Sequence, residues 1–169
     1  EHMNPKEIIM KLNEIGGKHG VGRIDHIEDR VVGLKSREVY EAPAALIAIE
    51  AHKDLEKMTL TTQELQFKRL VDDEWTNLVY AGLWMNPLRK ALEAFINETQ
   101  KRVNGEVKVK LYKGGMICVG RRSEYSIYNK ELATYEAWSI FNQKMAEGFI
   151  EIWGMQTVIA NRKLKMYGG

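Results

Sequence analysis

The chain has 169 residues, 44% of them hydrophobic, which is enough for one domain with a hydrophobic core and excludes an intrinsically disordered protein. Its 25 Lys and Arg residues nearly balance its 23 Asp and Glu residues, so the net charge of +2 gives no support to duplex nucleic acid as a partner. Its apolar runs fall short of the ~18 residues that a membrane helix needs, and the polar amino terminus does not resemble a signal peptide.

The first forty residues predict a helix followed by two strands. Residues 1–3 resemble a cloning remnant and are set aside. Apolar residues at helical spacing predict a helix over 5–15, capped by Asn4 and ended by the glycine pair 16–17. Residues 23–41, which contain β-branched side chains and a central glycine, then predict two successive strands.

Three helices are predicted in the middle of the chain. The first begins at Pro43, and because its opening turns are apolar on nearly all sides, we expect it to be buried. The second is capped by Thr61 or Thr62, with Glu64 close behind, and the third begins at Pro87.

A change of hydrophobic period predicts a hairpin after these helices. Side chains alternate between apolar and polar over 107–112, the glycine pair 114–115 is the predicted turn, and 116–119 forms a largely buried return strand. A short helix is expected over 148–153. The last residues, 157–169, mix apolar and basic side chains in a tail that we expect to dock on a partner.

This order of elements predicts an α+β fold without internal repeats. We expect a single compact domain over 4–156, with several helices and a small, mostly antiparallel sheet, followed by an oligomerisation tail over 157–169. The large aromatic side chains sit mostly at helical or core spacing. We interpret them as core or subunit interface rather than as base-stacking platforms: Trp75, Trp84, Phe95, Trp138, Phe141 and Trp153.

Neither a metal site nor a P-loop is indicated. The four histidines lack metal-binding spacing, and the single cysteine, Cys118, excludes a disulfide framework and favours a reducing, cytoplasmic setting. The glycine-rich run 16–22 follows a helix instead of a strand, and His19 stands where a P-loop has Ser or Thr. The run is therefore interpreted as a helix stop and a loop.

The most informative stretch is 16–43, which is dense in glycines and ionisable side chains. Such density predicts either a site for a small charged ligand or a strand pair joined by ion pairs, and the residues alone do not choose between them. Glu28 and Tyr40 form the best ligand pair, because a carboxylate binds an ammonium group and a phenol donates to a carboxylate or carbonyl. A strand reversal separates them, so both can face one pocket.

The same stretch carries a family pattern: GKHGVGR at 17–23, IDHIEDR at 24–30, GLKSREVYE at 33–41, and then a helix led by Pro43. Together these segments resemble the synthetase domain of the argininosuccinate synthase family. Further matching segments extend over nearly the whole remaining chain: 78–84, 87–89, 98–100, 105–107, 111–114, 120–123, 125–128 and 147–150.

The resemblance implies roles for particular residues. Glu28 and Tyr40 fall on two citrulline-binding positions of the family. Glu38 departs from the family, where many members have glycine, and a glutamate there requires ordinary backbone angles. The other charged residues are expected to pair with one another and orient the strands: Arg23, Asp25, Arg30, Lys35 and Arg37.

The resemblance also implies an ATP-dependent ligase of arginine biosynthesis, which joins citrulline and aspartate into argininosuccinate and releases AMP and pyrophosphate. Family members use ATP with magnesium, held by an amino-terminal nucleotide-binding domain with an S-G-G-x-D-[TS]-S loop, and no such run occurs here. We therefore expect a carboxy-terminal half that supplies part of the citrulline pocket and of a homotetramer interface. Alone it is expected to be inactive and without a cofactor, and the nucleotide-binding domain is its expected partner.

Two other functions stay open at this point. The chain also fits a stand-alone, non-catalytic oligomerisation module, because a retained Glu28 and Tyr40 pair indicates descent from the enzyme and not present binding. Nucleic-acid binding through the basic tail is the weaker alternative, and neither a nucleic acid nor a membrane is an expected partner.

Overall fold

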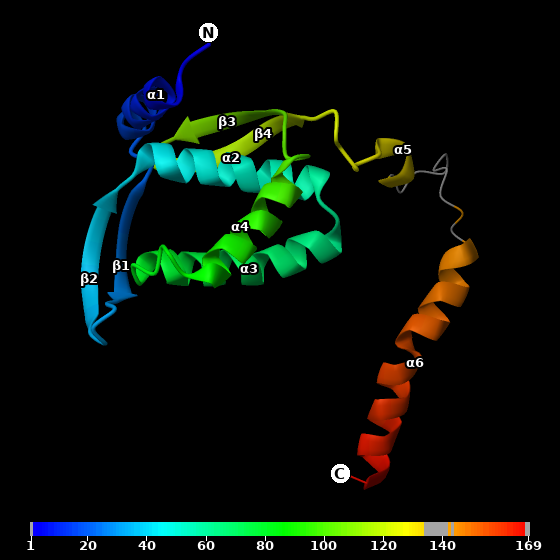
Figure 1. The fold of residues 1–169 in the computed structure, drawn as a ribbon. Coiled ribbons are helices and arrows are strands. Elements are labelled where there is room, and N and C mark those ends of the chain that lie inside the picture. The colour runs from blue at the N-terminus through cyan, green and yellow to red at the C-terminus, as the bar shows by residue number, and fades with distance from the viewer. Residues whose placement is uncertain (1, 134–141, 143, 168–169) are drawn as a thin grey trace. The chain divides into compact units, whose positions relative to one another are not determined.

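The computed structural model describes residues 2–133, 142 and 144–167, so Trp138 and Phe141 lie outside the described residues. The chain divides into two compact units, residues 1–127 and 128–169. In the first unit, shown in Figure 1, the elements follow one another as α1 (Pro5–Lys18), β1 (Arg23–Asp29), β2 (Lys35–Glu41), α2 (Pro43–Thr59), α3 (Thr62–Tyr80), α4 (Pro87–Gln100), β3 (Glu106–Tyr112) and β4 (Gly115–Arg122).

Helix α1 begins as predicted, with Asn4 and Glu7 in a reciprocal capping box. The predicted stop at the glycine pair is wrong, because the helix continues through Gly16 and Gly17 to Lys18. A Cβ atom on Gly16 would lie only 2.6 Å from the Cβ atom of Pro43. Gly16 is therefore a packing residue, which lets α1 approach the start of α2 closely.

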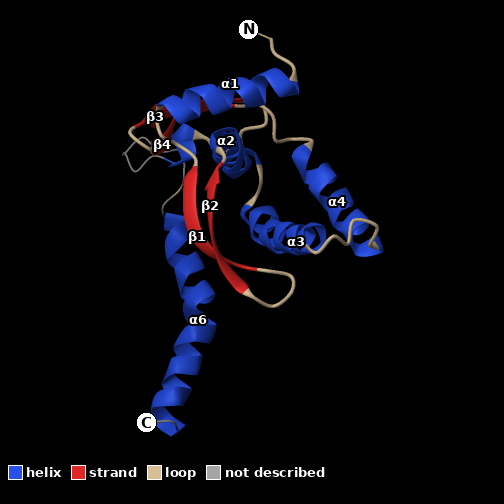
Figure 2. Cartoon of the chain, turned by 90° about the vertical axis from the view of Figure 1, so that its left-hand side faces the viewer, coloured by secondary structure: helices blue, strands red, loops and turns tan. Residues whose placement is uncertain are grey.

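Strands β1 and β2 form an antiparallel hairpin, as predicted, with Arg23 opposite Glu41 at one end and Asp29 opposite Lys35 at the other. Figure 2 shows this hairpin as a two-stranded ribbon that extends away from α1. Most of its side chains on both faces are exposed. Gly33, in the connecting turn, has a φ of +83°, a conformation that glycine adopts without strain.

Helix α2 begins at Pro43 as predicted, but the expectation that its opening turns are buried on all sides is only partly right. Ala44 and Ile47 are buried, whereas Ile49 is 51% exposed. Helix α2 packs against α1 and against the β3–β4 hairpin, and its buried Glu56 contacts Lys68 of α3 and Gln100 of α4.

Helices α3 and α4 pack against each other and complete the helical part of the first unit. Thr61, one of the two predicted caps, closes α3 with Glu64 in a second capping box. Asn86 caps α4, whose predicted start at Pro87 is confirmed. These local signals place the starts of α3 and α4 where the sequence predicts them.

The second hairpin, β3–β4, differs in two details from its prediction. Its turn residues are Lys113 and Gly114, with φ angles of +45° and +82°, so the turn lies one residue earlier than expected. Strand β4 alternates between half-buried and exposed positions and is not largely buried, since Ile117 is 65% exposed. The α+β class is confirmed, with two separate two-stranded antiparallel sheets among the described residues.

The second unit contains α5 (Lys130–Ala133) and α6 (Lys144–Tyr167). Helix α6 includes the short helix predicted over 148–153 and continues through most of the predicted tail. Its apolar side chains are exposed, and Phe149 stacks on Trp153 with 5.3 Å between ring centroids. No described helix is both long and apolar enough to span a membrane.

Candidate functional site

The candidate site lies on one face of the β1–β2 hairpin. Because side chains alternate along a strand, the even-numbered residues of both strands share this face. Tyr40 donates a hydrogen bond from its Oη to Oε2 of Glu28, at 3.0 Å. The structure thus brings together the two residues that the sequence selected as a ligand pair.

His26 lies beside this pair, and the sequence analysis did not select it. Its Nε2 is 3.3 Å from Oε2 of Glu28, and its ring meets the Tyr40 ring edge to face, with centroids 5.8 Å apart. Its position two residues before Glu28 on the same strand was a usable signal, because such residues share a face.

The electrostatics of the pair favour a protonated Tyr40. Its hydrogen bond to the Glu28 carboxylate raises the pKa of Tyr40 above its ordinary value. Tyr40 as a whole residue is 43% exposed to solvent, and the side chain of Glu28 is 22% exposed. The site is therefore an open wall that carries one hydrogen-bond donor and one carboxylate, and both remain reachable by a small ligand.

Arg30 and Glu38 support the same face from the turn end. The Arg30 guanidinium pairs with Glu38, and its Nε donates to Oγ of Ser36 at 2.9 Å. The hydrogen bond from Arg30 lowers the pKa of Glu38. Glu38 has an ordinary negative φ, as its side chain requires, and its contribution here is an ion pair within the hairpin.

The opposite face of the hairpin carries the other predicted ion pairs. Asp25 accepts two hydrogen bonds from Arg37, at 2.8 and 2.6 Å, which lower the pKa of Asp25. Lys35 pairs with Asp29 near the turn. Arg23 is the exception, because its side chain makes no ion pair or hydrogen bond with any described residue.

Tyr80, at the end of α3, fixes the far end of the hairpin. Its Oη donates to the backbone carbonyl of Asp29 at 2.8 Å. No signal in the sequence pointed to this contact, since 51 residues separate its two partners. Within the described part of the chain, no group of three or more His, Cys, Asp and Glu side chains has the arrangement of a metal site.

Comparison with known proteins identifies a family that the chain resembles over most of its length. A family model described as "Arginosuccinate synthase C-terminal domain" matches residues 1–160. Proteins named argininosuccinate synthase are similar to the chain: 62% identical over 97% of it in Pyrococcus furiosus, 53% over 96% in Crocosphaera subtropica and 51% over 98% in Trichodesmium erythraeum. The chain spans 40%, 41% and 41% of the lengths of these relatives, respectively.

Proposed function

The chain belongs to the family of argininosuccinate synthase C-terminal domains, and from this premise we propose that it supplies one wall of a citrulline pocket. The parent enzyme of this proposal joins citrulline to aspartate at the expense of ATP. In that reaction the ureido oxygen of citrulline attacks the α-phosphate of ATP and displaces pyrophosphate, and the aspartate amine then displaces AMP from the adenylate.

The hydrogen-bonded pair of Glu28 and Tyr40 carries the proposal. An amino acid presents an ammonium and a carboxylate, and the pair presents a carboxylate and a phenolic donor that match them. When the ammonium binds Glu28, the Tyr40 hydroxyl becomes free to turn from Glu28 toward the ligand. His26 lies 3.3 Å from Oε2 of Glu28, the same oxygen that accepts from Tyr40, and acts as a positioning residue.

ATP and magnesium belong to another part of the parent in this proposal. The pyrophosphate-binding run S-G-G-x-D-[TS]-S does not occur in residues 1–169. We assign nucleotide binding to the amino-terminal domain of the parent, and assign to this chain the positioning of citrulline against it. Such positioning lowers the barrier because it turns a collision between reactants into a step within one complex.

The test is the substitution Glu28→Gln in a full-length parent that carries this domain. Loss of the charge should raise the KM for citrulline by about tenfold or more and leave the KM for ATP nearly unchanged. Asp29→Asn is the matched control, because Asp29 lies on the other face of the same strand and is exposed. Equal effects of Glu28→Gln on both substrates would place Glu28 in a different site.

A second role, self-association, is favoured by the exposed apolar surface of α6. Phe149, Ile152 and Trp153 line one open hollow of this helix, and Trp153 is 77% exposed. An apolar surface of this kind is characteristic of a protein–protein interface. We propose that α6 joins copies of the chain in a closed homo-oligomer, a tetramer in the parent. The same surface would serve a non-catalytic oligomerisation module.

A further inference from the structure

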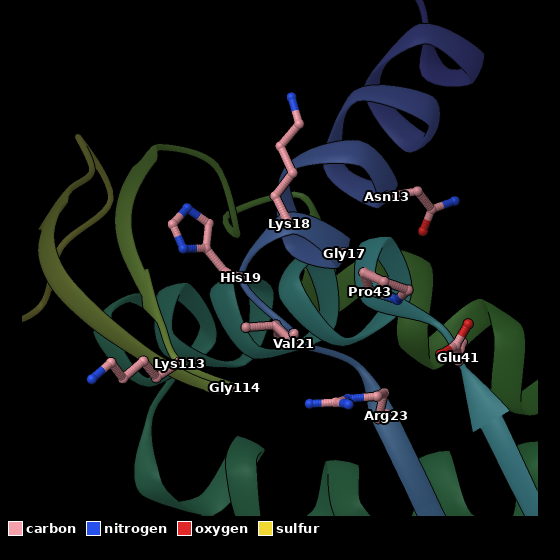
Figure 3. A pocket seen from close by; sticks show the side chains of 11 residues that line it. Asn13, Gly17, Lys18, His19, Val21, Arg23, Glu41, Pro43, Lys113 and Gly114 are labelled. Carbon is pink, nitrogen blue, oxygen red and sulfur yellow. The ribbon is translucent and has the colours of Figure 1, made fainter.

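A groove with a cavity volume of about 790 Å³ lies at the base of the β1–β2 hairpin, at the opposite end from its turn. The carboxy-terminal end of α1, the start of α2 and the β3–β4 turn form its walls (Figure 3). Its functional groups belong to Lys18, His19, Arg23, Glu41 and Lys113. Neither Glu28 nor Tyr40 lines this groove, so it is separate from the proposed citrulline wall.

The balance of charge in the groove is positive. Lys18 is neutralised by Glu14, with 2.6 Å between Nζ and Oε1. Arg23 and Lys113 have no carboxylate partner among the described residues, whereas the other basic residues of the β1–β2 hairpin are each paired. Glu41 is the single carboxylate in the lining, and Figure 3 shows the Arg23 side chain directed away from it, toward the β3–β4 turn. Two cations without a carboxylate partner therefore line the groove, and Nζ of Lys113 lies 5.3 Å from the centroid of the Tyr112 ring.

The Arg23 guanidinium lies against the turn at Gly20, and the β3–β4 turn contacts that turn from its other end. Gly114 donates from its amide to the carbonyl of His19 at 2.6 Å, which holds the β3–β4 turn against the loop after α1. A Cβ atom on Gly20 would lie 3.0 Å from Nη2 of Arg23. Gly20, with a φ of +69°, leaves the space in which the guanidinium rests against the backbone. The loop after α1, which the β3–β4 turn holds in place, thus positions Arg23.

The start of α2 adds to the positive potential of the groove. Its cap, Ala42, makes no side-chain hydrogen bond, and its first turn has no acidic residue to offset the partial positive charge of the helix end. The backbone amide of Ala44, in the first turn of α2, donates a hydrogen bond to Oδ1 of Asn13 at 2.9 Å. Pro43 and Asn13 both line the groove, so this helix end faces the same space.

We propose that the groove binds the phosphate group of a small molecule, with Arg23 as its principal ligand and Lys113 as a second cation at the rim. A phosphate monoester carries a charge of about −1.5 to −2 at pH 7, which matches these two unpaired cations. An arginine fork donates two parallel hydrogen bonds to phosphate oxygens, and a lysine acts as a point charge on a flexible stem. The proposed citrulline site uses none of these groups.

Calorimetric titration of the chain with inorganic phosphate and with ribose 5-phosphate tests the proposal, at an ionic strength held constant with sodium chloride. We expect saturable binding of at least one probe at one site per chain. Arg23→Gln should weaken it about tenfold or more, because a charge-assisted hydrogen bond is lost. Lys113→Gln should weaken it less, because Lys113 acts as a point charge at the rim. Tighter binding of the ester would identify an organic phosphate as the ligand, and equal binding would identify free phosphate.

Arg37→Gln is the matched control, because Arg37 lies in the same hairpin and its guanidinium already donates two hydrogen bonds to Asp25. It should leave the affinity unchanged, and all variants should keep the thermal midpoint of the parent chain within about 5 °C. Equal weakening by Arg37→Gln and Arg23→Gln would overturn the proposal. So would the absence of saturable binding, or binding of acetate as tight as that of phosphate.

Discussion

At the scale of single residues, the most consequential group outside the candidate site is a buried ion pair. Glu56 of α2 and Lys68 of α3 are 7% and 8% exposed, with 3.1 Å between Oε1 and Nζ. Gln100 donates to the same oxygen at 2.8 Å, and His52 lies 3.4 Å from it. Each partner makes the burial of the other tolerable, because an unpaired buried charge costs about 3–5 kcal/mol. This cluster joins three helices.

The stability of the protein should therefore depend on pH through Glu56. Burial raises its pKa, but hydrogen bonds from His52, Gln100 and Lys68 outweigh burial and lower the pKa to about 2. A lowered pKa contributes stability that is complete above the ordinary value of 4.5 and is lost as the pH falls toward 2. The free energy of unfolding in urea should fall by up to about 3 kcal/mol over that interval.

Glu56→Gln should remove most of this acid-induced loss. Glu98→Gln is the control, since the Glu98 side chain is exposed, and it should leave the pH profile unchanged. His52 acts in the opposite direction, because its hydrogen bond to Glu56 raises its pKa. Its contribution is complete below the ordinary value of 6.5 and is lost as the pH rises above it, so stability should be greatest near pH 5–6. A flat profile from pH 7 to 3 would contradict this account.

At the scale of elements, two adjacent glycines in α1 differ in packing: Gly16 lies against α2, whereas Gly17 has open space around it. A Cβ atom on Gly16 would approach Pro43 to 2.6 Å and Ile47 to 3.0 Å, whereas one on Gly17 would meet nothing within 4 Å. Both residues are inside the helix, so alanine improves helix propensity equally at either position. The difference between the two substitutions therefore isolates the packing of α1 on α2.

We expect Gly16→Ala to lower the free energy of unfolding by about 1–3 kcal/mol, because the added methyl group overpacks the contact between α1 and α2. Gly17→Ala should raise it by about 0.5–1 kcal/mol through helix propensity alone. Denaturant unfolding of the two variants beside the parent chain measures both effects. Stabilisation by Gly16→Ala would mean that α1 does not pack closely on Pro43.

At the scale of the whole molecule, the proposed self-association depends on α6. Light scattering of the purified chain at micromolar concentrations should give the mass of a dimer or tetramer. Deletion of 158–169 should lower this mass if the end of α6 forms the contact, and Trp153→Ala should lower it if the hollow near Phe149 does. Lys165→Ala is the control on the same helix. A monomer mass for the intact chain would refute self-association.

Residues 1–169 by themselves should release no pyrophosphate from ATP in the presence of citrulline, aspartate and magnesium. The reason is that the nucleotide-binding run is absent from these residues, and one wall of a pocket does not orient three ligands. Addition of the purified amino-terminal domain of the parent is the informative second arm. Turnover by the rigorously purified chain alone would contradict the division of roles proposed here.

Much of the local structure could be predicted, because its causes lie within a few residues. Helix starts are marked by the capping boxes at Asn4 and Thr61 and by the proline at position 43. These signals depend on residues at most four positions apart in the sequence. Period-two alternation predicts the second hairpin, and β-branched residues with a central glycine predict the first strand pair. The strand reversal between Glu28 and Tyr40 predicts that both can face one pocket, and the register of β1 and β2 in the structure places them on one face.

The sequence by itself determined the α+β class, the order of the elements and the candidate ligand pair, whereas only the tertiary structure decided how those elements close on one another. The tertiary structure decided that α1 continues past Gly16 and that Tyr80 binds the end of the β1–β2 hairpin. It also decided that Glu56 and Lys68 are buried together, and that Arg23 lies without an ion-pair partner in a groove lined by three segments. These features arise from contacts between distant residues. Local periodicity and propensity carry no information about such contacts, because the same short patterns are compatible with many packings.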